Sequence, residues 1–300
     1  MTMQFKVVAL LLLLVVTNSF GQPVFDVMSL QYQHIPSSTI LNNQVDGKSD
    51  INYFQSQLNI PWKWNRKNTA VFNPQYETRN ITYKPIVDPS SSTTLHLQAF
   101  SLMLSNQYVL NDTNQQLLFA AGIRHYATTE LTVSENTITP AFAALYAKRE
   151  SSSFAWKLGG YYSKEMFGNF WLPLLGFDWR VSDRFWCWGV LPRYAVFDYT
   201  ITPNWHSCIM YKGVTDTYRL PDEDWFLIGE GQLRWANDFY LPKLPFFITL
   251  DIGHSVSRQF QFYEASRFEK QKITPTNGLI LKLGLTYRVA TDKRFRTTKI

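Results

Sequence analysis

Apolar and polar residues alternate with a period of two along most of the chain, which is the pattern of β-strands with two different faces. In residues 279–289, leucine occupies positions 279, 281, 283 and 285, whereas Lys282 and Arg288 lie on the other face. Residues 225–235 and 246–256 alternate almost as regularly. Because such segments hold about ten residues, they predict strands longer than the five or six residues usual in globular proteins.

The same pattern, with more noise, recurs through the rest of the chain. It appears in 28–33, 54–62, 117–124, 154–162 and 175–181, and less regularly in 70–84, 94–105, 138–148, 186–200 and 205–219. In the segment 94–105 the apolar phase changes between Ala99 and Phe100, which predicts a β-bulge. Polar stretches at 36–50, 85–93 and 257–277 predict loops, and short turn signals separate the other strands.

Tryptophans stand near the ends of several predicted strands. Trp225 and Trp235 lie at equivalent phase within one segment. At about 3.4 Å per residue and a tilt of about 45°, roughly 24 Å separates them along the membrane normal, close to the apolar band of an outer-membrane barrel. We therefore predict that Trp62, Trp64, Trp225 and Trp235 are membrane-interface aromatics.

Long alternating strands, short turns between longer loops, and aromatic strand ends together predict an all-β fold. We expect a closed antiparallel transmembrane β-barrel of about 12 strands, with 10–14 possible, because a span of roughly 20–25 residues supplies one strand and its connection. The alternative fold is a secreted, soluble β-sandwich that binds glycans through its aromatic residues. No change of composition marks a second domain.

The N-terminal residues have the features of an export signal. Lys6 precedes the apolar run 7–16, which is too short to span a bilayer, and small residues at Ser19 and Gly21 suit cleavage before Gln22. The predicted domains are a signal peptide (1–21), an outer-membrane β-barrel (22–289) and a basic C-terminal tail (290–300). This organisation predicts a protein of the cell outer membrane that contacts outer-membrane lipid and depends on the barrel-assembly machinery for insertion.

Composition excludes several classes of protein. Of the 300 residues, 45% are hydrophobic and 17% charged, unlike a disordered chain. The mean hydropathy of −0.19 excludes a protein of many transmembrane helices. The net charge of +6 is modest and its basic residues are dispersed, so no nucleic-acid partner is expected.

A central segment carries a family resemblance. The run WLPLLGFDWRVSDRF, residues 171–185, continues through GVLPR (189–193) to FDY (197–199). It resembles the corresponding part of a family of uncharacterised gram-negative outer-membrane β-barrel proteins, with a P-x-x-G strand, a short turn and an L-P-R break. The N-terminal segment and the strand 278–289 resemble the ends of that family. The resemblance implies a fold and a location and no reaction.

Motifs of catalysis and metal binding are absent from the sequence. The five histidines show no zinc-ligand spacing, and neither a nucleophile elbow nor a glycine-rich phosphate loop occurs. An outer-membrane hydrolase of lipase or protease type remains an alternative, with a histidine paired across strands to a serine such as Ser207. We predict no catalytic, metal-binding or cofactor-binding residues. The two cysteines, Cys187 and Cys208, fall on strands expected to be neighbours, so they either bridge or remain buried thiols.

Charged residues on the polar faces define the expected lumen. The candidate lumen-facing residues are Arg124, Lys157, Asp178, Arg180, Glu230, Arg234, Asp251, Lys282 and Arg288. Their basic excess favours a narrow, non-enzymatic pore or transporter-like channel for small solutes, anionic solutes among them. Alternatively, pairs such as Glu230 with Arg234, or Asp178 with Arg180, close the interior of a structural surface protein.

Overall fold

The computed structural model describes residues 24–40, 47–65, 67–86, 89–110, 114–241, 246–265, 269–273 and 275–290. Most of these residues lie in strands, which are β1 (Val24–Ile40), β2 (Gly47–Leu58), β3 (Ile60–Lys63), β4 (Asn68–Pro85), β5 (Thr93–Val109), β6 (Gln115–Thr128), β7 (Ile138–Arg149), β8 (Phe154–Glu165), β9 (Gly168–Arg180), β10 (Phe185–Leu191), β11 (Tyr194–Thr202), β12 (Trp205–Arg219), β13 (Trp225–Tyr240), β14 (Phe246–Tyr263), β15 (Glu269–Ile273) and β16 (Leu279–Ala290). Two single turns of 3-10 helix occupy Pro89–Ser91 and Pro221–Glu223. No helix in this described part is long and apolar enough to cross a bilayer.

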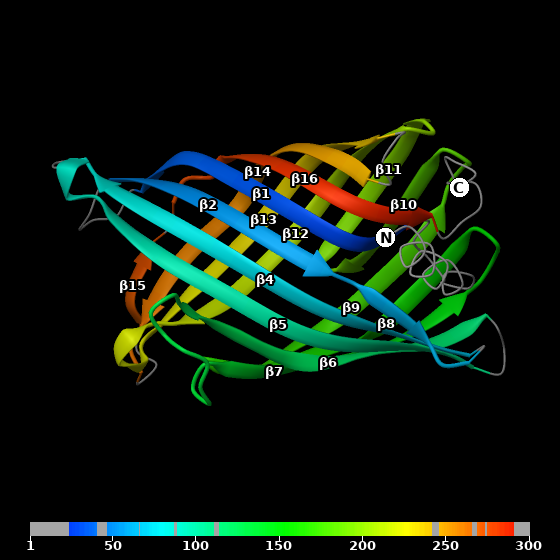
Figure 1. The fold of residues 1–300 in the computed structure, drawn as a ribbon, viewed down its shortest axis with the longest axis horizontal. Helices are drawn as coiled ribbons and strands as arrows, with labels where there is room; N and C mark the ends of the chain where they lie inside the picture. The colour runs from blue at the N-terminus through cyan, green and yellow to red at the C-terminus, as the bar shows by residue number, and fades with distance from the viewer. Residues whose placement is uncertain are drawn as a thin grey trace, which may run out of the picture.

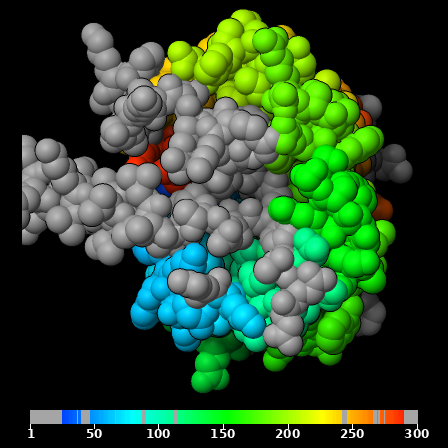
Figure 2. All heavy atoms as spheres, turned by 90° about the vertical axis from the view of Figure 1, so that its right-hand side faces the viewer, coloured from blue at the N-terminus to red at the C-terminus, as the bar shows by residue number. Residues whose placement is uncertain are grey.

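The strands form one antiparallel sheet that closes on itself. From β4 to β14 each strand pairs with the next, β2 joins β1 to β4, and β16 bridges β14 and β1. β3 extends the pairing of β2 along β4, and β15 pairs with the end of β14, so fourteen strands of the described chain form the ring. Figure 1 shows them tilted around a long axis, and in Figure 2 the coloured segments follow the circumference in chain order.

This closed barrel confirms the predicted fold class and excludes the β-sandwich. Its strand number lies at the upper limit of the predicted range, partly because segment 186–200 forms two strands instead of one. Pro192 and Arg193 make the turn between β10 and β11, where the Arg193 N–H donates to the Val190 carbonyl oxygen at 2.9 Å. Proline lacks the N–H that a continuing strand would need, which favours a turn at this point.

Strands occupy part of two stretches that the sequence predicts to be loops, 36–50 and 257–277. β1 continues to Ile40, and β14 continues to Tyr263 through the stretch predicted to be a loop. Along that extension, Ser257, Gln259 and Gln261 pair with Gly231, Gly229 and Leu227 of β13. The strand therefore continues with polar residues at alternate positions, and a search for apolar alternation ends too early.

The predicted bulge between Ala99 and Phe100 is wrong. The pairing of β5 with both β4 and β6 runs through this position without a shift. Leu97 and Ala99 are buried inside the barrel, whereas Phe100 and Leu104 are exposed on its outside. The apolar residues change face because part of the barrel interior is itself apolar.

The two faces of the barrel wall differ in chemistry. Large exposed apolar side chains cover the outside, as at Leu104, Leu175, Ile209, Leu250 and Leu283, each more than half exposed. Buried glutamine, serine, carboxylate and guanidinium side chains occupy much of the inside. An apolar exterior around a hydrogen-bonded, closed ladder is the arrangement that a bilayer requires of strands.

An apolar cluster fills the interior at one end. We call the end where β1 begins and β16 ends the proximal end, and the opposite end the distal end. The cluster lies toward the distal end and consists of Ile35, Ile51, Ile81, Leu97, Ala99, Tyr126, Tyr218, Phe226, Ile228, Phe260 and Ile280. These side chains come from nine strands and meet because the distal parts of β12 and β13 turn into the barrel, where β12 reaches β6. Figure 1 shows the yellow end of β12 and β13 beside the green ends of β6 and β7.

Candidate functional site

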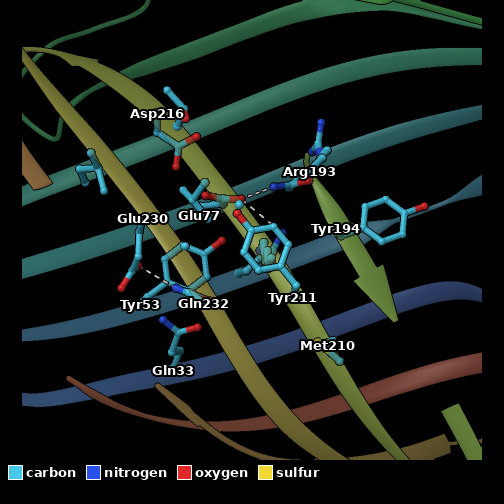
Figure 3. Close-up of a pocket in the computed structure, with 18 of the residues that line it drawn as sticks. Gln33, Tyr53, Glu77, Arg193, Tyr194, Met210, Tyr211, Asp216, Glu230 and Gln232 are labelled. Carbon is cyan, nitrogen blue, oxygen red and sulfur yellow. Dashed lines mark hydrogen bonds between the residues drawn. The ribbon is translucent and has the colours of Figure 1, made fainter. Parts of the chain in front are cut away.

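The barrel encloses a cavity of about 1280 Å³. Its lining includes six acidic residues, Asp26, Glu77, Asp216, Glu230, Asp238 and Asp251, and nine basic residues, Arg79, Arg124, Arg193, Lys212, Arg234, Arg258, Lys272, Lys282 and Arg288. Figure 3 shows Glu77, Asp216 and Gln232 among these side chains, with Arg193 and Tyr194 on the side of the β10–β11 turn. The lumen is thus polar, with an excess of basic groups.

Four charged residues on neighbouring strands form a band that we call the cationic girdle: Lys212 (β12), Arg234 (β13), Asp251 (β14) and Lys282 (β16). Lys282 pairs with Asp251 across the ladder, and Arg234 Nη1 lies 3.4 Å from Asp251 Oδ2. Within the described residues, no acidic oxygen lies at ion-pairing distance from the ammonium group of Lys212 or of Lys282. Arg234 and Lys282 therefore lie beside the one carboxylate of the girdle, Lys212 adds a third cation, and the formal charge of the four residues is positive.

A second polar group spans the lumen from β4 to β12. Arg79 Nη2 is 3.3 Å from Asp216 Oδ2, and the guanidinium carbon lies 5.1 Å from the centre of the Tyr53 ring and 5.8 Å from that of Tyr218. Beside it, Glu77 accepts hydrogen bonds from the amides of Gln55, at 3.2 Å, and Gln75. These contacts hold the Arg79 charge in place and leave it compensated.

The charges in the proximal part of the lumen also compensate one another. Arg288 lies between two carboxylates, with its Nε 2.5 Å from Asp26 and its Nη1 2.5 Å from Asp238. Thr249 donates a further hydrogen bond to Asp238 at 2.6 Å. Because this group of three charged residues is paired on both sides, the uncompensated cations are found at the girdle.

The structure places six of the nine predicted lumen residues at the cavity, namely Arg124, Glu230, Arg234, Asp251, Lys282 and Arg288. Lys157 and Asp178 face inward but pair with each other at 2.6 Å, apart from the cavity lining. Arg180 pairs with Asp183 of the following turn and lies over the Trp186 ring, 5.9 Å from its centre. Arg180 is therefore a residue of the proximal rim.

The predicted ion pairs within single strands are wrong, although the charges are paired. Glu230 pairs with Arg258 at 2.6 Å and not with Arg234, and Asp178 pairs with Lys157 and not with Arg180. Residues directly opposite on adjacent strands lie about 5 Å apart, closer than residues two apart on one strand. Glu230 and Arg258 occupy such opposite positions on β13 and β14.

Three of the four predicted interface aromatics are exposed on the outside: Trp62 at 68%, Trp64 at 64% and Trp235 at 53%. Trp225 does not fit this role, since it is only 1% exposed. Its ring stacks on Tyr263 with 3.8 Å between centroids and lies 6.1 Å from Phe167. The inward turn of distal β13 buries Trp225. Its distance from Trp235 therefore does not correspond to the thickness of the apolar layer of a membrane.

No histidine is placed beside the candidate nucleophile Ser207 in the described pairing. Ser207 Oγ accepts a hydrogen bond from the Trp235 indole at 2.8 Å, and its cross-strand neighbours are Tyr199 and Asn237. His206, the adjacent residue, faces inward and contacts Asp198 at 3.3 Å. The geometry thus does not assemble the predicted serine–histidine pair. Among the described residues, no cluster of potential metal ligands occurs.

The two cysteines do not form a bridge. Cys187 and Cys208 are both free and buried. β11 separates them: Cys187 pairs with Phe197 and Cys208 with Asp198, two positions that point to opposite faces of β11. The expected adjacency fails because segment 186–200 contains an additional strand.

Several lumen residues are not predicted from the sequence. Glu77 and Arg79 lie in an irregular segment whose polar positions nevertheless alternate with a period of two, a signal that could have identified them. Lys212 and Asp216 belong to a strand whose distal half has both faces covered, which blurs the alternation. Arg258 falls in a stretch that the sequence predicts to be a loop, although it is one of the most deeply buried cations of the barrel.

A second cavity, of about 430 Å³, lies at the distal end. Its walls include Ile81, Leu95, Phe226, Phe260 and Phe262, so it is mainly apolar. Phe226 and Phe260 also belong to the apolar cluster that fills the distal interior. This cavity and the main one therefore lie on different sides of the same cluster.

No family model matches the chain, and no curated protein matches it. The resemblance of residues 171–199 to a family of outer-membrane proteins stays a prediction. The predicted signal peptide and basic tail lie outside the described residues.

Several solved structures are similar in backbone path. An outer-membrane channel from Pseudomonas putida F1 is 12% identical, with 90% of this chain and 96% of that chain covered and a TM-score of 0.49. A mutant of the TodX monoaromatic hydrocarbon channel is 8% identical, with 89% and 90% covered and a TM-score of 0.48. The translocator domain of the autotransporter NalP from Neisseria meningitidis is 10% identical, with 96% and 95% covered and a TM-score of 0.39. With every score below 0.5, none of these likenesses bears on the function of this chain.

Proposed function

We propose that this chain is an integral outer-membrane β-barrel that admits small anionic solutes to its lumen and is not an enzyme. The observation that carries the proposal is the cationic girdle, which holds the three cations Lys212, Arg234 and Lys282 and only one carboxylate, that of Asp251. Rings of basic side chains are the usual means by which pores favour anions. A solute anion would compensate the two ammonium groups that have no acidic oxygen at ion-pairing distance in the described lumen.

The membrane location rests on the exterior of the barrel. Exposed leucine, isoleucine, phenylalanine and tryptophan side chains would be costly in water as one continuous surface, whereas lipid accommodates them. Closure of the ladder leaves no long sheet edge around most of the circumference. Outer-membrane lipid is therefore the proposed surrounding, and the barrel-assembly machinery the proposed means of insertion.

Planar-bilayer recording of the full-length chain tests the proposal. Under a KCl gradient we expect a reversal potential of the sign that indicates anion preference. The double variant Lys212→Gln/Lys282→Gln should lower the ratio of chloride to potassium permeability severalfold. Lys84→Gln/Lys148→Gln is the matched control, because both of these lysines have exposed side chains and lie outside the cavity lining.

A substitution in the apolar cluster provides a second test. If the native chain conducts weakly, Tyr218→Ala should widen the distal lumen and reveal the same anion preference. Cation preference, or a permeability ratio that the double lysine variant leaves unchanged, would contradict the proposal. The absence of current from both the native chain and Tyr218→Ala would remove solute passage and leave a structural barrel.

A further inference from the structure

The barrel wall is incomplete between β9 and β12. The β10–β11 hairpin is short, so β9 pairs with β10 only from Leu175 to Arg180. On its other edge, β12 pairs with β11 only from Trp205 to Lys212, followed by one hydrogen bond from the Gly213 N–H to the Arg193 carbonyl. Distal to these points, Gly168–Leu174 and Val214–Tyr218 each have a ladder partner on one side only in this fully described stretch. We call the gap between them the lateral opening.

The gap persists because β12 leaves the wall. Its last residue, Arg219, bridges to Ala127 of β6, Tyr218 stacks on Tyr126, and Thr217 donates a 2.6 Å hydrogen bond to Glu165. All three contacts lie inside the barrel. They hold the distal half of β12 against β6 and the end of β8, and so leave Gly168–Leu174 of β9 without a ladder partner on that side.

Gly213 marks the point where β12 begins to diverge. A β-carbon at this position would lie 2.8 Å from the Pro192 carbonyl oxygen. Its ladder partner on β13 is also a glycine, Gly231. Paired glycines allow the close approach and bending that a side chain at either position would hinder.

The main cavity continues into this opening. In a closed wall only alternate residues of a strand line the lumen. Here the consecutive residues Met210–Asp216 of β12 and Ile228–Gln232 of β13 all line the cavity, together with Leu172 and Leu174 of β9 and the Pro192–Arg193 turn. The cavity therefore borders both faces of these two strands and reaches the free edges of β12 and β9.

The opening lies at the height of lipid. On the outer face of β9, Trp171 is 71% and Leu175 59% exposed, and the unpaired stretch begins between them. Unpaired backbone groups within the apolar layer are tolerated where they line a cavity that holds water or a polar solute. A route between the membrane and the lumen satisfies that condition.

The lip of the opening has two kinds of chemistry. Phe170, Leu172 and Leu174 of β9 present apolar side chains to the cavity, whereas Arg193 on the hairpin turn is exposed and cationic. Figure 3 shows Arg193 beside Tyr194 on this side of the cavity. None of the ion pairs between described residues involves Arg193.

We infer that the lateral opening is a passage between the bilayer and the lumen for small amphipathic anions. The apolar part of such a molecule would contact the β9 lip, and its anionic group would bind Arg193 and then the cationic girdle. The inference rests on the proposed function for the second step, since it assumes that the girdle receives an anion. It adds the class of solute and the route.

Lipid-phase quenching tests the opening without any ligand. In a Cys187→Ala/Cys208→Ala background, single cysteines at Thr215 (lip of β12), Ile123 (outer face) and Gln57 (lumen) would carry a bimane label in vesicles with doxyl-labelled acyl chains. We expect the label at Thr215 to be quenched to at least half the extent seen at Ile123, and the label at Gln57 to be spared. Quenching at Ile123 alone would overturn the lateral opening, whatever the ion selectivity of the barrel.

Binding of a defined probe tests the class of solute. The native protein in lipid nanodiscs should bind 11-(dansylamino)undecanoate, and Arg193→Gln should weaken binding about tenfold, the loss expected for one charge-assisted hydrogen bond. Arg184→Gln, an exposed arginine in the β9–β10 turn at the proximal end, is the matched control and should bind as the native chain does.

Three results would overturn the assignment of the probe to this route. They are no binding, equal binding by Arg193→Gln, and loss of binding only in Phe262→Ala, which would place the probe in the distal apolar cavity. The bilayer recordings are independent of these measurements. Anion preference without probe binding would thus retain the proposed function and reject the lateral route.

Discussion

Tyr218 of β12 stacks on Tyr126 of β6 across the interior of the barrel, with 5.3 Å between ring centroids and 23° between ring planes. These strands are far apart around the ring, so the contact crosses the lumen. Tyr218 is 1% exposed and belongs to the cluster that fills the distal interior. The distal lumen is thus closed by wall residues themselves.

Removal of the crossing ring should open the distal end. Tyr218→Ala would delete the stacking contact, worth about 1 kcal/mol beyond its burial, and leave a cavity between β6 and β12. We expect a larger single-channel conductance in planar bilayers and a barrel that still shows heat-modifiable gel mobility, since the wall ladder is unchanged. Tyr199→Ala, an exposed tyrosine of the outer face, should conduct as the native chain does. Equal conductance of both variants would show that the cluster does not limit passage.

The ion pair of Arg258 and Glu230 should be important for stability. The Arg258 side chain is fully buried, pairs with Glu230 at 2.6 Å, and donates to Ser38 Oγ at 2.9 Å. Arg258→Met would leave the carboxylate without its cation, at a cost of about 3–5 kcal/mol. Denaturant unfolding of the barrel in lipid vesicles measures this loss.

The control for that loss is the double variant Arg258→Met/Glu230→Gln, which removes both charges. It should recover most of the stability lost in Arg258→Met, because no uncompensated charge remains. A double variant as unstable as the single one would mean that packing, and not charge, explains the effect.

A charged residue in the middle of the outer face should destabilise the barrel in a bilayer. Leu283 is 53% exposed in the middle of β16, with Tyr32 and Leu250 as its cross-strand neighbours. Leu283→Arg should destabilise the barrel by about 2–4 kcal/mol in a bilayer. The control, Gln31→Arg, adds the same side chain to the lumen lining and should cost much less. If both variants fold equally well into vesicles, the face that we assign to lipid does not contact it.

The thiols should behave as two separate, buried groups. Because Cys187 and Cys208 are two strands apart, gel mobility of the unfolded protein should be the same with and without a reducing agent. Both should react with maleimide once the barrel is unfolded and slowly before. A mobility shift on reduction that the Cys187→Ala variant abolishes would show that a bridge forms.

A large part of the fold follows from local pattern alone. Alternation over 279–289 and 246–256 requires an extended backbone with one apolar face, and each residue's face depends only on its own parity in the strand. Six of the predicted lumen residues line the cavity for that reason. The closed antiparallel barrel was predictable because apolar faces of this length need lipid and a closed ladder.

Tertiary structure decided everything that depends on distant partners. Glu230 faces inward by parity, but only the register of β13 against β14 selects Arg258 as its partner. Parity places Trp225 outside, and the inward turn of β13 buries it. The short β10–β11 hairpin and the departure of β12 toward β6 create the lateral opening. These features arise from contacts between residues tens of positions apart, which a period of two does not encode.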